Sequence, residues 1–181
     1  MHSTAVRNQK LTKTAQVLLY FFAFADFLPR PFESKTRYFK RSISGKSNSF
    51  TSYKILKRLE ERGSLKIFKD GTKNLYALTA KGKLEAIFIK ARIPERKAWD
   101  GKWRMVIFDI PEGSRSERHK LRSLLKSNGF KQVQKSVFIN PWPLNHEAIV
   151  YLRETGLNKF IRVFRVDDAD NQADLKKMFA L

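Results

Sequence analysis

Residues 103–140, WRMVIFDIPEGSRSERHKLRSLLKSNGFKQVQKSVFIN, carry the pattern that decides the fold of the second half of this chain. Within them, residues 103–110 predict a strand that is apolar on both faces, because Met, Val, Ile and Phe follow one another without a break. Residues 114–129 then predict a helix, which begins with Ser114 and Glu117 in the spacing of a capping box and ends at an Asn-Gly pair. This helix carries Leu121, Leu124 and Leu125. The stretch therefore predicts a domain that mixes strands with helices.

The elements that follow complete this domain. The pattern predicts two strands at residues 130–134 and 136–140, a second helix at 143–154 and a fourth strand at 160–166. The resulting order, βαββαβ, is that of the ferredoxin-like plait, in which both helices cover one face of an antiparallel sheet. We therefore expect an α+β fold with a ferredoxin-like domain over residues 99–181.

The other face of this sheet also carries apolar residues, which a monomer should not leave exposed. A homodimer formed sheet to sheet would cover them, so we expect residues 99–181 to be a dimerisation domain. The first part of the chain could instead cover the same face within one molecule, and the sequence leaves both arrangements open.

The first 98 residues predict a separate domain. We expect helices at residues 12–28, at 33–41 and from a turn at 45–49 to Glu61, then two strands at 64–68 and 74–78 joined by an Asp-Gly turn, and a helix at 79–92. Three helices followed by a two-stranded hairpin make a winged helix-turn-helix. Pro94 and Gly101 lie in a stretch of mixed charge, where we place the domain boundary, near residue 98.

The net charge of the chain indicates an anionic partner. It is +20, and residues 1–98 contribute most of it, with 22 basic and 7 acidic residues against 15 and 10 in residues 99–181. Nucleic acid is the first candidate, because neutralising phosphates releases condensed counterions. An anionic membrane or an acidic protein would also attract such a charge.

Other aspects of the composition exclude several classes of protein. The chain has no Cys and three scattered His, so it predicts neither a disulfide framework nor a zinc site. The apolar stretch at residues 15–25 is too short to span a bilayer, and we interpret it as the first helix of the domain rather than as a secretory signal. The expected location is the cytoplasm.

The third helix predicts a surface suited to the major groove of DNA. One side carries apolar residues, namely Phe50, Tyr53, Leu56 and Leu59. The opposite side carries hydroxyls and cations, namely Ser47, Thr51, Lys54 and Arg58. An ordinary amphipathic helix with a solvated face would show the same pattern, but the basic hairpin that follows favours DNA over a winged helix that contacts only proteins.

From this arrangement we predict the DNA-binding residues. Thr51, Lys54 and Arg58 are expected to contact the groove, and Ser47, Lys57 and Arg62 to contact phosphates. Three lysines on or beside the hairpin tip, Lys66, Lys69 and Lys73, are expected to place the wing against the backbone or the minor groove.

Three stretches resemble known proteins, two of them a single family. Residues 99–112 (WDGKWRMVIFDIPE) and 129–138 (GFKQVQKSVF) resemble the central domain of PaaX-type repressors, which in turn resembles CRISPR-associated protein two, and residues 75–82 (LYALTAKG) resemble the wing exit of bacterial winged-helix regulators. The resemblance implies a DNA-binding transcriptional repressor. PaaX-type repressors have a further C-terminal domain, associated with response to an aryl-CoA effector. We expect this chain to lack that domain, and we assign no small-molecule effector.

Asp109 is the one candidate for a catalytic or metal-binding residue. In the CRISPR-associated relatives an acidic residue at this position is proposed to bind a divalent metal across the dimer. Here Asp109 has only Glu112 close by in the sequence, and Ile139 occupies a position that is acidic in many of those relatives, whereas a metal-dependent nuclease needs clustered oxygen ligands. We therefore expect no enzyme activity, no cofactor and no metal, with Asp109 as a turn or ion-pairing residue.

These inferences combine into one hypothesis. The chain is expected to be a homodimeric, sequence-specific DNA-binding regulator, a repressor, with double-stranded DNA as its partner and no membrane contact. Two alternatives remain, namely a metal-dependent nuclease that uses Asp109 and an architectural protein that coats DNA without sequence preference. The sequence does not decide the role of an acidic cluster near the end of the chain, formed by Asp167, Asp168, Asp170 and Asp174.

Overall fold

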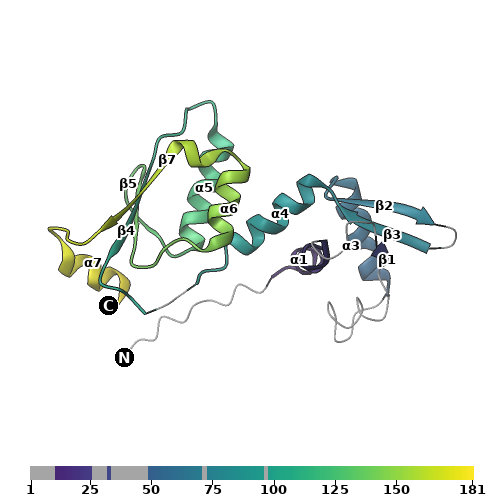
Figure 1. Ribbon diagram of the computed structural model, residues 1–181, viewed down its shortest axis with the longest axis horizontal. Helices are drawn as coiled ribbons and strands as arrows, with labels where there is room; N and C mark the ends of the chain where they lie inside the picture. The colour runs from purple at the N-terminus through teal and green to yellow at the C-terminus, as the bar shows by residue number, and fades with distance from the viewer. Residues whose placement is uncertain (1–10, 26–31, 34–48, 71–72, 96–97) are drawn as a thin grey trace. The chain divides into compact units, whose positions relative to one another are not determined.

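The structure, a computed structural model, describes residues 11–25, 32–33, 49–70, 73–95 and 98–181. The chain divides into two compact units, Met1–Ala86 and Ile87–Leu181, and both mix helices with antiparallel sheet (Figure 1). The expected α+β class is therefore confirmed. The boundary near residue 98 stays a prediction.

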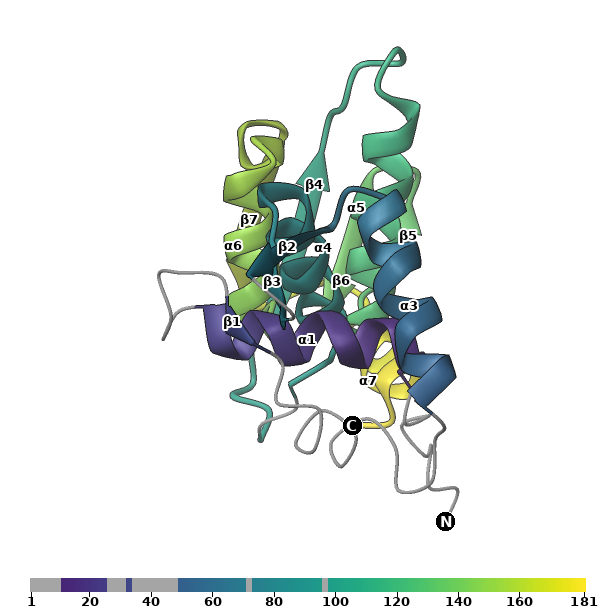
Figure 2. The ribbon, with the colours of Figure 1, turned by 90° about the vertical axis from the view of Figure 1, so that its right-hand side faces the viewer.

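The first unit contains a three-stranded antiparallel sheet with helices packed on it. Its elements are α1 (Lys13–Ala25), β1 (Phe32–Glu33), α3 (Ser49–Glu61), β2 (Leu65–Asp70), β3 (Lys73–Leu78) and the start of α4 (Ala80–Ala91). The strand order is β1-β3-β2, and α1 packs against α3 and β3 (Figure 2). Glu33 lies in strand β1, so the expectation that a helix begins there is wrong. The remainder of that expected helix lies outside the described residues, and the winged helix-turn-helix stays a prediction.

The core of the first unit is formed where α1, α3 and the hairpin meet. The apolar residues that meet there are Val17, Leu18 and Phe21 of α1, Ile55, Leu56 and Leu59 of α3, Leu65 of β2 and Tyr76 of β3. Burial also raises the pKa of the Tyr76 phenol above its ordinary value. Each helix contributes residues at a spacing of three or four, which places them on one face.

A tight corner joins the end of α3, the hairpin and the start of α4. Gly63 ends α3 with a positive φ of 71°, a conformation that glycine adopts without strain. The Thr79 hydroxyl accepts a hydrogen bond from the Gly82 backbone N–H, at 3.0 Å, and donates one to the Gly63 carbonyl, at 2.7 Å. Thr79 thus caps α4 and ties its beginning to the end of α3.

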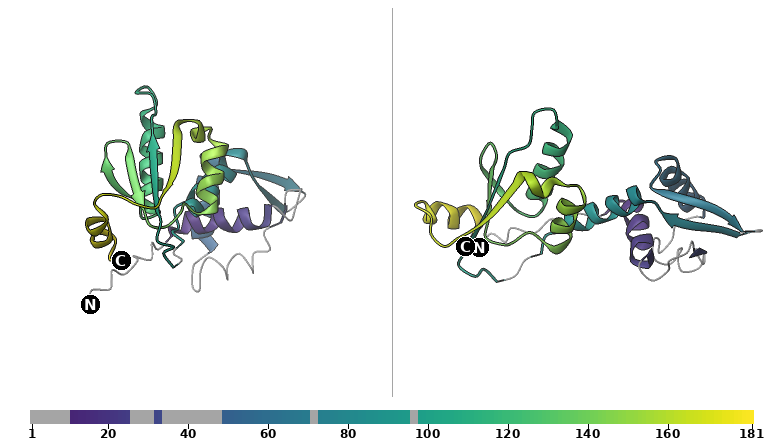
Figure 3. Two further views of the ribbon diagram at one scale, coloured as in Figure 1. Left: turned by 60° about the vertical axis from the view of Figure 1, so that its left-hand side comes forward. Right: turned by 45° about the horizontal axis from the view of Figure 1, so that its top comes forward.

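The second unit has the predicted ferredoxin-like topology. Its elements are the last residues of α4, then β4 (Trp103–Phe108), α5 (Arg115–Ser127), β5 (Lys131–Gln134), β6 (Val137–Asn140), α6 (His146–Glu154), a 3-10 turn at Leu157–Phe160, β7 (Ile161–Val166) and α7 (Gln172–Phe179). The strand order is β5-β6-β4-β7, with every pair antiparallel. Helices α5 and α6 lie on one side of the sheet and α7 lies on the other (Figure 3).

The core of the second unit lies between the sheet and helices α5 and α6. Val106 of β4 pairs with Phe138 of β6, and both side chains are fully buried. Facing them are the buried apolar residues of the helices, Leu121, Leu124 and Leu125 of α5 with Ala148, Tyr151 and Leu152 of α6. The leucines predicted to line α5 therefore form the core.

Two details of the predicted helices are wrong. Helix α6 begins at His146 rather than at residue 143, because the Asn145 side chain caps it by accepting a hydrogen bond from the Ala148 backbone N–H. Ser114 stands before α5 as predicted, but its side chain makes no capping hydrogen bond. The capping box with Glu117 is therefore absent.

Helix α7 covers one end of the second sheet face, where Trp103, Ile139 and Leu175 form a buried apolar cluster. Phe179 of α7 and Trp99 lie against Trp103, with ring centroids 5.7 Å and 5.1 Å away. The sequence left the role of this acidic C-terminal stretch undecided. Part of it is a helix that packs on the sheet.

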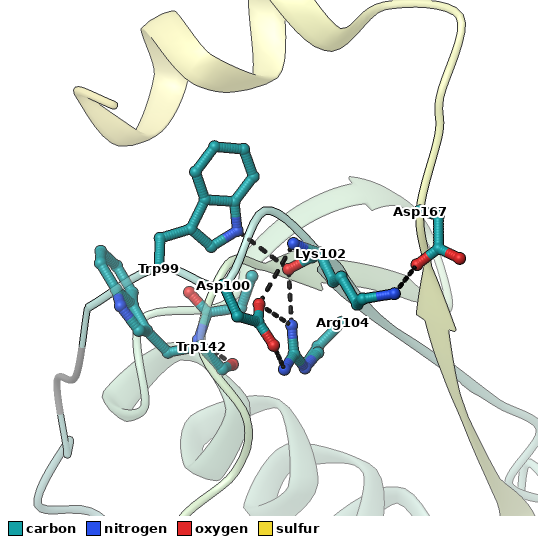
Figure 4. A network of polar contacts seen from close by, with 7 residues as sticks. Trp99, Asp100, Lys102, Arg104, Trp142 and Asp167 are labelled. Carbon is teal, nitrogen blue, oxygen red and sulfur yellow. Dashed lines mark hydrogen bonds and ion pairs between the residues drawn. The ribbon is translucent and has the colours of Figure 1, made fainter.

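A polar network lies beside this cluster (Figure 4). Arg104 donates hydrogen bonds to both carboxylate oxygens of Asp100, at 2.8 and 2.6 Å, and holds the pKa of that carboxyl well below its usual range. Lys102 donates to Asp167 at 2.7 Å, which lowers the pKa of the Asp167 carboxyl. The Trp99 indole N–H donates to the Lys102 carbonyl. At least one member of the acidic cluster thus pairs within its own chain.

Candidate nucleic-acid interface

Helix α3 presents cations to solvent along the side that faces away from the core. Lys54, Lys57 and Arg58 are all exposed, and these are three of the residues predicted to contact DNA. At 100° per residue, Lys54 and Arg58 lie within about 40° of each other, and Lys57 lies about 60° beyond Lys54. The helix therefore offers three positive charges over roughly a third of its circumference.

Tyr53 lies on this exposed side, and the sequence analysis missed it. Its side chain is 62% exposed, so its expected place in the core is wrong. The position of Ile55 explains the difference, because burial of Ile55 with Leu56 and Leu59 turns the apolar face away from Tyr53. Including Ile55 in the periodicity would have found this residue.

The remaining residues predicted on and around α3 have different outcomes. Ser47 lies outside the described residues, as does the side chain of Thr51, whose backbone belongs to α3. Arg62 is exposed but pairs with Glu85, with 3.6 Å between Nη2 and Oε1. Glu85 also accepts a hydrogen bond from the buried Ser64 hydroxyl, at 2.9 Å, so this carboxylate is held in place.

The hairpin places its described lysines on opposite faces of the ribbon. Lys69 pairs with Asn74 on the face that carries the buried Leu65, whereas Lys66 pairs with Ala77 on the other face. Both lysines are exposed. Lys73 opens strand β3, and its side chain lies outside the described residues. The two described lysines therefore project from opposite faces of the hairpin.

In the second unit, part of the sheet face turned away from α5 and α6 remains exposed. Met105 of β4 pairs with Phe164 of β7, and Ile107 pairs with Val137 of β6, all on this face. Phe164 is 47% exposed and Ile107 is 38% exposed. An apolar area is thus left beside the part that α7 covers.

Asp109 follows strand β4 and is exposed. Its backbone N–H donates to the Phe160 carbonyl at 3.0 Å, which joins the end of β4 to the start of β7. Across the described part of the chain, no three His, Cys, Asp or Glu side chains come together in a way that could hold a metal ion. In the described part of the chain, Asp109 fixes the end of strand β4 through its backbone.

A comparison with protein families identifies the second unit. Residues 96–178 match the model of the PaaX protein central Cas2-like domain. The chain carries a PaaX-type central domain. The resemblance inferred from residues 99–112 and 129–138 is thereby confirmed, and so is the ferredoxin-like fold of this PaaX-type domain.

Other comparisons add little. The chain is similar to a solved structure of an uncharacterized protein from Mycobacterium tuberculosis, Rv0674, at 18% identity and a TM-score of 0.39. The match covers 92% of this chain and 66% of that one. No curated protein matches the sequence. None of the helices in the described ranges is both long and apolar enough to cross a membrane.

Proposed function

We propose that this PaaX-type chain is a sequence-specific DNA-binding transcriptional regulator that acts as a repressor in the cytoplasm. The observation that carries the proposal is the exposed face of α3, where Lys54, Lys57 and Arg58 face solvent while Ile55, Leu56 and Leu59 anchor the helix in the core. A helix anchored on one side and cationic on the other suits the major groove, with Tyr53 as a further contact. Lys66 and Lys69 of the hairpin would contact phosphates.

We propose that the regulator is a homodimer formed through the exposed sheet face of the second unit. The area around Ile107 and Phe164 supports this, since a monomer seldom leaves large apolar side chains together in water. Helix α7 restricts the contact to the end of the face that it leaves open. A dimer would bind two half-sites about one helical turn of DNA, or a multiple of it, apart.

Substitutions on α3 and on the hairpin test the DNA assignment. Arg58→Ala should lower affinity for a selected site by about 1–3 kcal/mol and affinity for random duplex by less, because a base contact is lost. Lys69→Ala should weaken both classes of DNA similarly, because a phosphate contact carries no sequence information. Equal losses from Arg58→Ala on both classes would remove the base-reading role of α3.

The nuclease alternative rests on Asp109 alone. Incubating the protein with labelled DNA and RNA in Mg²⁺ or Mn²⁺, and repeating this with Asp109→Asn, separates it from the regulator. Metal-dependent cleavage that the substitution abolishes would overturn the proposal. Uniform binding to every duplex in a salt titration would instead favour the architectural alternative.

A further inference from the structure

Helix α5 of the second unit carries basic side chains along its whole length. At 100° per residue, five of them fall within an arc of about 100° and form what we call the α5 stripe, namely Arg115, Arg118, His119, Arg122 and Lys126. Arg115, His119 and Lys126 are exposed, and the two remaining arginines are half-buried. The buried leucines of α5 lie on the side of the helix that faces the sheet. The stripe is therefore a solvent-facing ridge about 17 Å long.

The α5 stripe has no acidic partner in the described part of the chain. Within the described residues, none of its members takes part in an ion pair. Arg118 and Arg122 are four residues apart, as are Arg122 and Lys126, and like charges at this spacing destabilise a helix. Arg115 and Arg118 also lie in the first turn, where the helix dipole disfavours cations. The row of charges therefore opposes the stability of the helix that carries it.

Two arginines of the stripe are held in position by the fold. Arg118 donates a hydrogen bond to the Glu112 backbone carbonyl at 2.8 Å, and Arg122 donates one to the Lys135 carbonyl at 3.2 Å. The Arg122 guanidinium also lies over the Phe108 ring, 5.9 Å from its centroid. Because their partners are neutral, both side chains are ordered while they keep their full charge. Ordered cations lose less entropy when they bind an anion.

The surroundings of the stripe indicate the class of anion. Its border on the outer side of α5 consists of serines, Ser116, Ser123 and Ser127, and Glu117 lies toward the sheet. The ridge has no apolar or aromatic side chain, so it lacks the anchors of a protein hot spot or a membrane-binding helix. It also lacks the rings on which single-stranded bases stack. A straight row of Arg and Lys bordered by hydroxyls fits a regular line of phosphates.

We propose that the α5 stripe is a second DNA-binding surface, which contacts the phosphate backbone of duplex DNA. The proposal rests on the proposed function only for the choice of DNA as the partner. It adds a role for the PaaX-type domain beyond dimerisation. Each strand of duplex DNA presents a phosphate about every 3.4 Å along the axis, so the ridge is long enough to contact several of them. The stripe contributes affinity and no sequence preference.

A double variant of the full chain tests this surface. Arg115→Gln with Lys126→Gln removes two charges whose side chains make no hydrogen bond or ion pair within the described residues. The probe is a random-sequence duplex, and the measurement is the dependence of affinity on salt. The slope of log K against log salt should become shallower by about 2, which reduces the loss of affinity between 50 and 200 mM salt roughly tenfold.

The matched control removes two exposed cations from the same unit, outside α5. Arg153→Gln with Lys177→Gln changes the net charge equally and should leave the slope close to that of the wild type. Equal slopes in the two double variants would overturn the proposal, as would an unchanged slope in the α5 variant. Because the probe has no chosen sequence, the result is independent of whether the chain reads a specific site.

Chemical footprinting provides a second readout on the unaltered chain. Acetylation by an amine-reactive reagent, followed by mass spectrometry, reports the accessibility of each lysine with and without saturating random duplex. Lys126 should be protected by DNA, and Lys177 should react equally in both samples. Unchanged reactivity of Lys126 at saturation would overturn the proposal and assign the stripe to another anion, such as an acidic protein.

Discussion

Gly82, in the first turn of α4, lies directly against the carbonyl oxygen of Ser64. A Cβ on Gly82 would come within 1.9 Å of that oxygen and 2.9 Å of its carbon. This approach allows α4 to start beside the end of α3, where Thr79 joins the two. Only glycine fits here without moving the backbone.

Gly82→Ala should therefore destabilise the protein, although alanine is the better helix former. The intrinsic gain is about 1 kcal/mol, whereas the overpacking that forces two backbone segments apart costs about 1–3 kcal/mol and occasionally more. Chemical denaturation measures the difference. Gly113→Ala is the control, since nothing lies within 4 Å of its Cβ position. Equal stability of the two variants would show that the corner tolerates a side chain.

Asn145 should contribute more to stability than an ordinary helix cap. Its amide donates to the Ile93 carbonyl at 2.6 Å and to the Ala91 carbonyl at 3.3 Å, while its oxygen caps α6. Asn145→Ala should lower the free energy of unfolding by about 1–3 kcal/mol, because the Ile93 carbonyl loses the Asn145 donor and α6 loses its cap.

Asn145→Asp separates these two roles. It keeps an oxygen for the Ala148 N–H but turns a carboxylate toward the carbonyls at the end of α4. Denaturant titrations should find this variant clearly less stable than the wild type. Stability equal to that of the wild type would mean that Asn145 acts only as a cap.

The Lys90–Glu147 ion pair should make stability depend on pH. Lys90 donates to Glu147 at 2.8 Å, and this hydrogen bond lowers the pKa of the Glu147 carboxyl below its ordinary value of 4.5. A lowered pKa in the folded state stabilises the protein at pH values above 4.5, and this contribution is lost as the pH falls through the folded value.

Glu147→Gln should therefore reduce the free energy of unfolding at pH 7 and have a vanishing effect in acid. Urea midpoints measured at several pH values test this. Glu154→Gln, an exposed position at the end of the same helix, is the control. A deficit in Glu147→Gln that stays constant down to the lowest pH would exclude the ion pair as its cause.

Phe179→Ala should loosen α7 from the sheet. Trp103 is fully buried beneath this helix and Trp99 packs beside it, so the tryptophan fluorescence of the protein should become easier to quench with acrylamide. Met178→Ala is the matched control, because the Met178 side chain is 46% exposed. Unchanged quenching in the Phe179 variant would show that α7 does not depend on this aromatic contact.

Periodicity predicted the elements of the second unit well, because its helices bury leucines at a regular spacing. Leu121, Leu124 and Leu125 could be placed in the core from sequence alone. The start of α6 could not, since it depends on Asn145, whose amide bonds to residues more than fifty positions earlier in the chain. The pattern of a short segment does not predict contacts with residues so far away in the sequence.

The sequence predicted only part of the candidate interface, because local patterns show the period of an element but not its contacts. The exposed cations of α3 followed from its period, but Tyr53 was misplaced because Ile55 was left out of the apolar face. Lys66 and Lys69 were grouped by their proximity in sequence, whereas strand alternation separates them. The α5 stripe was visible in the sequence, but it could be recognised only after the structure had shown that its cations have no acidic partners among the described residues.

The claim that this chain reads a DNA sequence is tested most directly by selecting binding sites from a random duplex library with the full-length protein. We predict an enriched element that occurs twice, with its copies one helical turn of DNA or a multiple of it apart, and a marked loss of enrichment with Arg58→Ala. Retention of duplexes without any enriched sequence would contradict the account.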